Sequence, residues 1–419
     1  MADYRLTPPE EILETTVQHL PLSKSISARA LILNSITRNA QAVDHSKVAD
    51  CSDTRLIAAC LPLRSGTADV ADCGTAARFL TSFYAATPGV DIIIDGGNRL
   101  RQRPIAPLVD VLRSLGANIE YVGTDGRLPL HIQGRQLSGG AVKLNASASS
   151  QFASALALMA PTMAAPLTID LGGEIPSMPY LLMTLKMLAN RGVEWEQRGY
   201  AFHIANTPCK PCDIEAEGDW SAAAFWYAIA GVSAGWVTLP QLQRPSLQGD
   251  AILCNIGERF GVITNDADEG TGVELSATPD LWSRLDMDMA DYPDLVAPLA
   301  VTAALINLPF VFTGVGNLRY KESDRIAAII EELARIGIIA SATDDTLQWE
   351  GERQPVTEMP VFDSHGDHRI AMALAPVALF IPGIIIRNAH VVEKSYPDFW
   401  LDLADAGFTV EDISSTPEP

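Results

Sequence analysis

The chain has 419 residues, of which 47% are hydrophobic and 19% are charged, and its formal net charge at pH 7 is −21. This composition is typical of a globular protein with two or more domains and excludes a chain that is disordered along its length. The negative charge argues against nucleic acid or an anionic membrane as a partner, because either would need a broad basic surface. No apolar run reaches membrane-spanning length, and we find no basic and apolar regions of a secretory signal at the N-terminus.

The six cysteines are sparse for a chain of this length and indicate a reducing, cytoplasmic location. Cys209 and Cys212 have the spacing of a metal or redox pair, but no second pair accompanies them and no βαβ redox pattern surrounds them. We therefore expect no metal at these cysteines.

Six apolar, alanine-rich stretches have the character of helices that are buried on all sides. Each begins at a polar cluster, and after a first interval near 50 residues the starts recur at intervals of about 70 to 75 residues. The predicted buried helices are 25–36, 75–86, 150–160, 221–230, 294–306 and 368–380.

Four further segments each predict an amphipathic helix that ends at a glycine in the position of a C-cap, followed by two short strands. The predicted helices are 104–116, 179–192, 247–261 and 322–337, and their strands are 118–122 and 127–133, 193–197 and 200–204, 262–265 and 273–277, and 338–341 and 346–350. Together the segments predict six related units in an α/β or α+β fold, with sheets outside and helices inside. The first unit is short, because after a helix near 53–61 the chain reaches Asp72 without the strands of the other units.

The polar starts of the buried helices suit an anion site, because a helix N-terminus carries free N–H groups and a partial positive charge. Simple N-capping by Ser, Thr or Asp would explain each cluster singly, and for Asp219 it is an equal alternative. Capping does not explain Lys24, Arg78 or Arg369 beside apolar helices, since buried cations need partners.

The stretch Tyr320-Lys-Glu-Ser-Asp-Arg325 places two cations and two acids directly before an amphipathic run. On a helix, Lys321 and Arg325 would share a face, with Glu322 beside them in the first turn. Such a turn would hold an anionic ligand with a carboxyl group against it; a solvated helix start with ordinary charge pairs is the alternative. Asp324 is interpreted as a pair or cap partner.

A series of short motifs runs along the chain: Leu22-Ser-Lys-Ser-Ile-Ser-Ala-Arg29, Gly74-Thr-Ala-Ala-Arg78, Arg99-Leu-Arg-Gln-Arg-Pro104, Ser149-Ser-Gln151, Ser177-Met-Pro-Tyr180, Glu217-Gly-Asp219, Asp286-Met-Asp-Met with Pro293-Asp294, Asn317 with Lys321-Glu-Ser-Asp-Arg325, Asp367-His-Arg369 and Lys394-Ser-Tyr-Pro397. In this order the motifs resemble those of the 5-enolpyruvylshikimate-3-phosphate (EPSP) synthases, a family of enolpyruvyl transferases, along nearly the whole chain.

The resemblance implies a two-domain inside-out α/β barrel with three βαβαββ units in each domain. Residues 1–22 and 217–419 would form a discontinuous domain, residues 23–216 an inserted domain, and the active site would lie in the cleft between them. The implied reaction transfers the enolpyruvyl group of phosphoenolpyruvate to the 5-hydroxyl of shikimate 3-phosphate and releases phosphate, as a step towards chorismate and the aromatic amino acids. It implies a monomeric, cytoplasmic enzyme without a metal or organic cofactor.

The resemblance also assigns residues to the two substrates. Hydroxyl groups and N–H groups at helix starts suit the phosphate of shikimate 3-phosphate, and a guanidinium group suits its carboxylate. The implied residues for this substrate are Lys24, Ser25, Arg29, Ser149, Ser150, Gln151, Ser177, Asp294, Asn317 and Lys321. Those for phosphoenolpyruvate, which needs several cations, are Lys24, Gly74, Arg103, Gln151, Arg325, Arg369 and Lys394.

Carbon chemistry requires that the enol carbon gain a proton and that the attacking hydroxyl lose one. The resemblance assigns Asp294 as the base and Glu322 as the acid. Because two neighbouring cations would keep Glu322 ionised, we expect it to donate only when a polyanionic substrate is bound, and Lys394 is the alternative donor. A metal at His365, His368 and their neighbouring acids is not expected, since Arg369 would oppose a cation.

The chain departs from the family pattern at Asp72-Cys73, where Asn-Ala is usual, and at Leu22, where glycine is common. These changes bear on phosphoenolpyruvate binding and on sensitivity to the family's inhibitor, glyphosate. The related transferase acting on UDP-N-acetylglucosamine is the nearest alternative, but its reactive cysteine loop with Arg-Pro-Gly is not found, since Arg103-Pro104 continues as Ile-Ala. A ligand-binding relative without activity would lack Asp294, Glu322 or Lys394, and all three are present.

Overall fold

The computed structural model describes residues 2–11, 13–37, 43–145, 149–213, 215–267 and 272–414. It divides into two compact units. The C-terminal unit comprises Met1–Ser23 and Glu217–Pro419, and the inserted unit comprises Lys24–Ala216. At the two crossings the chain pairs with itself, because Leu22 forms a bridge with Gly218 and the Ser23 N–H donates to the Glu217 carbonyl at 2.7 Å. The predicted boundaries at residues 22 and 217 fall at this pairing.

The described part of the C-terminal unit holds three four-stranded sheets, each with parallel and antiparallel neighbours. The first sheet places the N-terminal strand between two strands from the end of the chain. In spatial order the sheets are β18 (Val361–Asp363), β19 (Ile384–Arg387), β1 (Tyr4–Thr7) and β20 (Thr409–Asp412); β12 (Phe260–Asp266), β13 (Val273–Leu281), β11 (Trp236–Leu239) and β2 (Glu14–Thr16); and β14 (Leu285–Asp288), β15 (Phe310–Thr313), β17 (Thr346–Trp349) and β16 (Ser341–Ala342).

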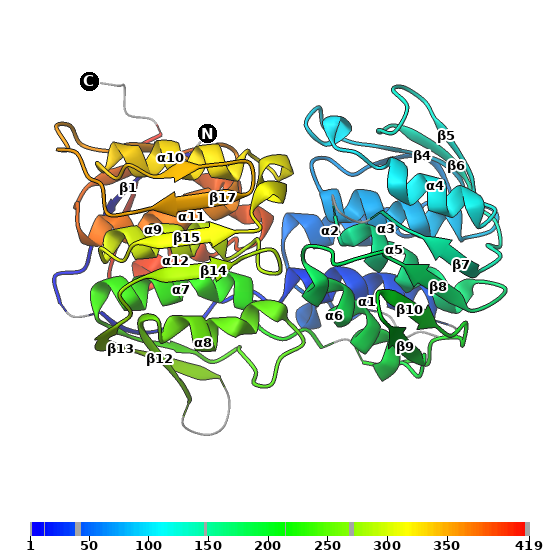
Figure 1. Cartoon of the computed structure of the whole chain (residues 1–419), viewed down its shortest axis with the longest axis horizontal. Helices are drawn as coiled ribbons and strands as arrows, with labels where there is room; N and C mark the ends of the chain where they lie inside the picture. The colour runs from blue at the N-terminus through cyan, green and yellow to red at the C-terminus, as the bar shows by residue number, and fades with distance from the viewer. Residues whose placement is uncertain are drawn as a thin grey trace. The chain divides into compact units, whose positions relative to one another are not determined.

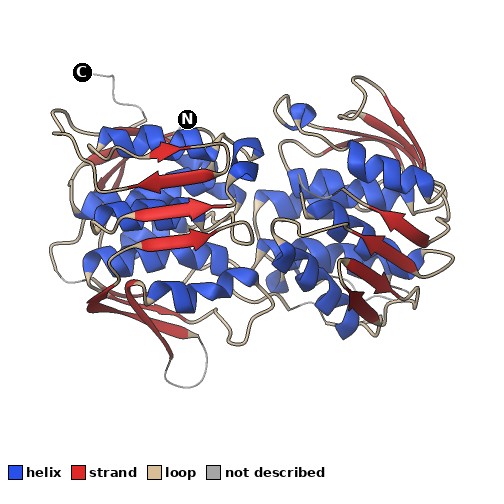
Figure 2. Cartoon of the chain, viewed as in Figure 1, coloured by secondary structure: helices blue, strands red, loops and turns tan. Residues whose placement is uncertain are grey.

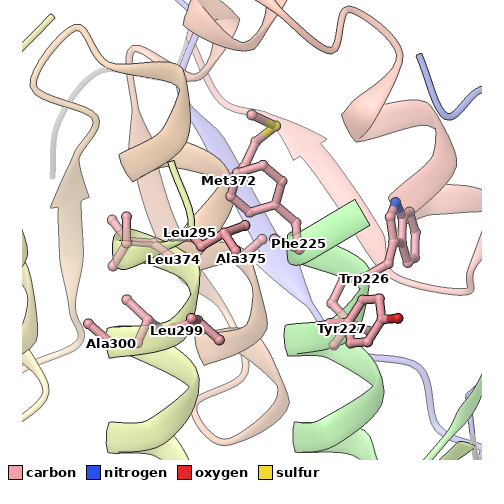
Figure 3. Packing of buried hydrophobic residues seen from close by; sticks show 14 of the residues in the cluster. Phe225, Trp226, Tyr227, Leu295, Leu299, Ala300, Met372, Leu374 and Ala375 are labelled. Atoms are coloured by element: carbon pink, nitrogen blue, oxygen red, sulfur yellow. The ribbon is translucent and has the colours of Figure 1, made fainter. Parts of the chain in front are cut away.

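The core of the C-terminal unit is formed by three helices without a polar face, α7 (Trp220–Ser233), α9 (Val296–Leu305) and α11 (His368–Leu374). Figure 3 shows side chains from these helices, such as Phe225, Leu299 and Met372, gathered in one apolar cluster. A helix that is apolar all round is stable only when it is enclosed, so the sheets must lie outside it. The other helical segments are η4 (Gly249–Ile252), α8 (Leu253–Gly257), η6 (Gly316–Tyr320), α10 (Arg325–Arg335), η7 (Ala375–Leu379), η8 (Ala389–Lys394) and α12 (Phe399–Asp405).

The inserted unit repeats this plan with two four-stranded sheets in its described part. In spatial order they are β3 (Ser65–Asp69), β4 (Asp91–Asp95), β6 (Leu130–Gln133) and β5 (Asn118–Tyr121), and β7 (Gly140–Lys143), β8 (Leu167–Asp170), β10 (Ala201–Ile204) and β9 (Trp195–Arg198). Its helical segments are α1 (Lys24–Ile36), η1 (His45–Lys47), α2 (Ser52–Cys60), α3 (Gly74–Ala85), η2 (Leu100–Gln102), α4 (Ala106–Ser114), α5 (Gln151–Met159), η3 (Ala160–Thr162) and α6 (Met178–Asn190). Figure 1 places these elements, and Figure 2 shows strands on the outside of helices in both units.

The predicted fold class of repeated α/β units with buried helices is confirmed. The first unit contributes α1 and α2 but no sheet of its own among the described residues, in agreement with its predicted shortness. Residues 65–69, where no strand was expected, form β3, which joins the sheet of the next unit. No described helix is long and apolar enough to cross a bilayer.

Three of the four predicted C-cap glycines, Gly116, Gly192 and Gly337, follow a helix and have φ between 76° and 98°. The prediction for Gly261 is wrong. The helix ends earlier, at Gly257, and Gly261 lies inside β12 where the register shifts between Phe260 and Val262. Its φ of 82° therefore serves a β-bulge and not a helix end.

Candidate active site

Arg325, the first residue of α10, is the centre of an ion-pair cluster in the C-terminal unit. Its side chain is 3% exposed, and it donates from Nε to Asp367 at 2.8 Å and from Nη1 to Asp294 at 2.9 Å. A third donation, from Nη2 to Glu322, also measures 2.9 Å. A buried guanidinium with three carboxylates is stable because each charge has an opposite neighbour and a hydrogen bond.

Two further cations complete the cluster. Arg369, on α11, approaches Asp294 Oδ2 at 2.9 Å, and Lys394, at the end of η8, approaches Glu322 Oε1 at 3.6 Å. The starts of α10 and α11 and the residues before α9 therefore converge. The structure thus brings together all three predicted catalytic residues and both predicted arginines of this unit.

Burial alone would raise the pKa of Asp294, but the charges of Arg369, Arg325 and Lys321 outweigh it and hold that pKa well below its usual range. For Arg325, burial opposes the charged form, and the carboxylates of Asp367, Glu322 and Asp294 raise its pKa above the ordinary value. Both groups are consequently charged at neutral pH, and Asp294 is a carboxylate in the resting protein.

The stretch 320–325 differs in one respect from the prediction. The helix α10 begins at Arg325, so Lys321 and Glu322 precede it and do not lie in its first turn. Asp324 is the N-cap, since its carboxylate accepts from the Ala327 N–H at 3.1 Å, and this confirms its predicted structural role. Glu322 reaches Arg325 from the bend before the helix. Asn317, in η6, has a buried Oδ1 without a hydrogen-bond partner among the described residues.

In the inserted unit, Arg29 joins the first turns of three helices. From α1 it donates to Thr184 Oγ1 at 2.7 Å and to the Tyr180 carbonyl at 3.0 Å, both on α6. It also donates to Ser154 Oγ on α5 at 3.4 Å and, within α1, to the Ser25 carbonyl at 2.8 Å. Burial lowers the pKa of Arg29 to about 10. Among the described residues, these bonds use four of its five N–H groups.

The predicted phosphate-binding hydroxyls lie at two helix starts. Ser150 is the N-cap of α5, Ser149 precedes it, and Ser177 is the N-cap of α6; neither N-cap hydroxyl is used to cap its own helix. Ser177 has φ 63° and ψ 35°, a left-handed conformation that is unfavourable for a residue with a Cβ. Gln151 links α5 to α3 through Nε2 to Thr75 Oγ1 at 3.0 Å, and its buried Oε1 has no hydrogen-bond partner in the described chain.

Gly74 opens α3 against two guanidinium groups. A Cβ at this position would lie 2.5 Å from Arg78 Nη1 and 2.7 Å from Arg103 Nη1, so only glycine fits without displacing them. Arg78 donates to the Gly74 carbonyl at 2.9 Å. The departure at Cys73 is accommodated as the N-cap of α3, where its buried sulfur accepts from the Ala76 N–H at 3.3 Å.

Lys24, the first residue of α1, forms an ion pair with Asp53 at 3.1 Å. Asp53 lies in the first turn of α2, and both side chains are largely buried. A carboxylate here holds the ammonium group at the helix start, where the dipole alone would repel it. Ser25 follows Lys24 on the same turn.

Sequence reasoning did not assign a role to Asp367 or Asp53, the carboxylates that hold Arg325 and Lys24. Asp367 is fully buried and also caps α11 through the Arg369 N–H at 3.0 Å. Its position beside Arg369 in the sequence was a usable signal. Asp53 had none, because it pairs across 29 residues without a motif.

Two carboxylate and histidine groups in the described chain have a spacing that would suit a metal, His19 with Asp402 and Asp405, and His365 with Glu331 and Glu332. The second group is held by ion pairs of its own: Glu332 contacts His365 at 2.7 Å and Arg335 at 2.8 Å. Neither group belongs to the cluster around Arg325, and acidic groups of this kind are common without an ion.

A family model, EPSP synthase (3-phosphoshikimate 1-carboxyvinyltransferase), matches residues 62–403. A 3-phosphoshikimate 1-carboxyvinyltransferase of Bacteroides fragilis (strain YCH46) is 40% identical over 412 residues, which cover 97% of this chain and 98% of that protein. The chain belongs to the EPSP synthase family. A second member, from Syntrophobacter fumaroxidans, is 35% identical over 91% of this chain and 94% of its own length.

Solved structures agree in fold with this EPSP synthase family member. An EPSP synthase from Acinetobacter baumannii superposes with a TM-score of 0.77 at 21% identity, over 98% of this chain and all of that one. The enolpyruvyl transferase NikO from Streptomyces tendae gives a TM-score of 0.73 at 16% identity, over 98% of each chain. The resemblance inferred from the motifs is confirmed at the level of the family.

Proposed function

We propose that the Arg325 cluster and the helix starts of the inserted unit bind the two substrates of the family's reaction, phosphoenolpyruvate and shikimate 3-phosphate. The reaction transfers the enolpyruvyl group of the first to the second and is a step of aromatic amino acid biosynthesis. The proposal depends on one observation: five residues predicted from four motifs form one connected set of ion pairs. They are Asp294, Glu322, Arg325, Arg369 and Lys394.

The proposed phosphoenolpyruvate ligands include Arg325, Arg369 and Lys394 in the C-terminal unit. In the resting protein these cations are neutralised by carboxylates, so a ligand with about three negative charges must take over part of that pairing. Gly74, Arg103, Lys24 and Gln151 of the inserted unit are the further proposed ligands. The close approach of two guanidinium groups to Gly74 supports this role, because the backbone there presents no side chain to an anion.

The proposed shikimate 3-phosphate ligands present hydroxyl groups and one remaining arginine N–H. Ser149, Ser150 and Ser177 lie at the starts of α5 and α6, where N–H groups and the helix dipole favour a phosphate. Arg29 would offer its fifth N–H to the ring carboxylate, next to Ser25. Gln151, Lys24, Asp294, Asn317 and Lys321 complete the proposed set.

The proposed mechanism is addition followed by elimination. Asp294 accepts the proton of the 5-hydroxyl while the hydroxyl oxygen forms a bond to C2 of phosphoenolpyruvate and C3 gains a proton. The tetrahedral intermediate then loses phosphate from C2 and returns a proton from C3 to the group that donated it, which restores the double bond. Arg325 and Arg369 hold Asp294 as a carboxylate before the reaction, so the base is in its active charge state. A bound polyanion weakens their hold and increases its basicity.

Glu322 is the proposed acid and Lys394 the alternative. Glu322 contacts both Arg325 and Lys394, so binding of phosphate by these two cations would free the carboxyl group to carry a proton. Lys394 contacts the same carboxylate. The distances favour neither donor, so the assignment of Glu322 depends on the variants below.

Phosphate release measured with both substrates, and with each omitted, tests the activity. We expect release only with both substrates, and folded protein that releases none would reject the proposal. Glu322→Gln should lower single-turnover chemistry by about 10²–10⁴-fold while phosphoenolpyruvate still binds. Glu331→Gln, an exposed change on α10, is the matched control and should stay near the wild-type rate. Normal single-turnover chemistry in Glu322→Gln would transfer the role to Lys394.

A further inference from the structure

Asp250 is a buried carboxyl group to which neither the sequence motifs nor the mechanism above gives a role. It lies in η4, next to the start of α7, and is 2% exposed. Its Oδ2 is hydrogen-bonded to the Ser221 hydroxyl. Its Oδ1 is buried and has no hydrogen-bond partner in the described part of the chain. One hydrogen bond is too few for a buried carboxylate but sufficient for a neutral carboxylic acid.

The turn that carries Asp250 is held firmly. Glu217 accepts from the Leu247 N–H at 3.0 Å and from Gln248 Nε2 at 3.1 Å, and Gln248 Oε1 accepts from the Trp220 N–H at 3.0 Å. These bonds tie the residues before η4 to the first residue of α7. Asp250 therefore cannot turn outward to water without breaking a buried network.

The charged and titratable groups that face Asp250 come from three directions. Asp219 and Ser221 belong to the start of α7, Asp294 and Tyr292 to the segment before α9, and Arg369 to α11. Burial and then the charge of Asp294 raise the pKa of Asp250 to about 7, while Ser221 and Arg369 act in the opposite direction. Asp250 thus shares Arg369 and Asp294 with the proposed phosphoenolpyruvate site.

We propose that Asp250 is a positioning residue for enolpyruvyl transfer. Its carboxyl group is uncharged, so Arg369 can pair with Asp294 and with the anionic substrate. Ionisation of Asp250 weakens the binding of phosphoenolpyruvate. The inference rests on the proposed function of the Arg325 cluster. When Asp250 loses its proton to water at high pH, its negative charge offsets part of the positive charge of Arg369, and the site becomes less positive by one charge. A ligand with about three negative charges loses most from such a change.

The charge state is tested first without substrate, by urea unfolding of wild-type protein and Asp250→Asn between pH 4.5 and 8.5. A carboxyl group with a raised pKa in the folded protein binds its proton more tightly there than in the unfolded chain, so its contribution to stability falls as pH rises from about 4 to 7. Asparagine does not titrate. The difference between the urea midpoints of Asp250→Asn and wild type should therefore increase in favour of the variant up to about pH 7. Above this pH the difference should stay constant. A constant offset throughout would overturn the inference.

The second test is the KM for phosphoenolpyruvate between pH 6.5 and 8.5. In the wild type it should increase by up to about tenfold per pH unit above 7, whereas in Asp250→Asn it should change by less than about threefold per unit. Asp280→Asn, on the exposed end of β13, is the control for a general loss of negative charge and should follow the wild type. Parallel profiles in wild type and Asp250→Asn would reject the role of Asp250.

A second variant guards against a failure of Asp250→Asn to fold. Ser221→Ala removes the one hydrogen bond that favours the ionised form, so the increase in KM should begin at a higher pH than in wild type. An unchanged profile in Ser221→Ala would contradict the inference. If wild-type protein releases no phosphate but shows the predicted unfolding profile, the proposed function is rejected. The inference that Asp250 is uncharged would then still hold.

Discussion

The two units each bury an arginine in a helix, Arg325 at the start of α10 and Arg29 in the second turn of α1, and they satisfy it in opposite ways. Arg325 in the C-terminal unit has three carboxylates around it, whereas Arg29 in the inserted unit has two hydroxyls and two carbonyls. Carboxylates raise the pKa of Arg325, and burial lowers that of Arg29 to about 10. The first environment is built from charges that titrate, and the second from dipoles that do not.

This difference matches the two tasks that we propose. Proton transfer requires groups whose charge changes during the reaction, and these are concentrated around Arg325. Positioning of a phosphate requires fixed N–H and hydroxyl donors, which do not depend on pH. We therefore expect changes in the C-terminal unit to affect turnover and pH dependence, and changes in the inserted unit to affect substrate binding.

The largest effect should come from Arg325→Met. It leaves Asp294, Glu322 and Asp367 without their shared cation, and breaking a buried ion pair in this way costs about 3–5 kcal/mol. Arg29→Met, the matched change in the inserted unit, removes hydrogen bonds to neutral groups and should cost about 1–3 kcal/mol. Urea unfolding of both variants measures the difference. Equal losses in the free energy of unfolding would contradict the proposed difference between the two environments.

Gly74→Ala should act on binding and leave the fold intact. The added Cβ would lie 2.5 Å from Arg78 and 2.7 Å from Arg103, and the flexible guanidinium groups would move away from it. We expect the KM for phosphoenolpyruvate to increase by about 10-fold, the equivalent of one charge-assisted hydrogen bond, with a smaller change in kcat. Initial-rate kinetics with each substrate varied in turn provide the check. A loss confined to kcat would place this residue with the chemistry and not with binding.

Ser177 allows the backbone and the hydroxyl to be separated. Both Ser177→Gly and Ser177→Ala remove the proposed phosphate ligand and should increase the KM for shikimate 3-phosphate by about 5- to 10-fold. Glycine adopts φ 63° without the steric cost of a Cβ, so Ser177→Gly should be more stable than Ser177→Ala by about 1 kcal/mol. Different KM values for the two variants would show that the conformation of this residue, and not its hydroxyl, sets binding.

The smallest expected effect concerns His19, on the surface of the C-terminal unit. Its hydrogen bond and ion pair with buried Asp402 raise the pKa of His19. A histidine with a raised pKa in the folded protein contributes stability below about pH 6.5, and this contribution is lost as pH increases through the folded pKa. Because the ring is 42% exposed, the change should remain below about 1 kcal/mol. His19→Asn should remove it, which unfolding at pH 6 and 8.5 would detect.

Local signals were sufficient for most of the fold. Alanine-rich runs predicted the six buried helices, and three of the four glycines were correctly placed after helices, because both features depend on neighbouring residues. Gly261 was misassigned since a positive φ serves a bulge as well as a helix end. The start of α10 was placed three residues early, because the predicted helix began at Glu322 whereas α10 begins at Arg325, directly after its N-cap Asp324.

The site was predictable only as far as motifs extend. Motifs identified the cations and the two proposed proton-transfer groups, but they did not show that Asp53 and Asp367 hold Lys24 and Arg325 in place. Asp53 pairs with Lys24, and the charge of Arg369 acts on Asp250, although in both cases the two residues are distant in the chain. A sequence shows which charges are present, whereas burial and distant pairing decide which of them titrate.

The position of β1 has a consequence for synthesis of the protein. This strand is the third in a sheet whose other members, β18, β19 and β20, come from the last part of the chain. The inserted unit contains all its strands between Lys24 and Ala216 and can close as soon as these residues have left the ribosome. At about 5–20 residues per second, β1 then waits roughly 10–40 s for the strands on either side of it. During this time its hydrogen-bonding edges are exposed, and the nascent chain is most open to chaperones and to wrong strand pairing.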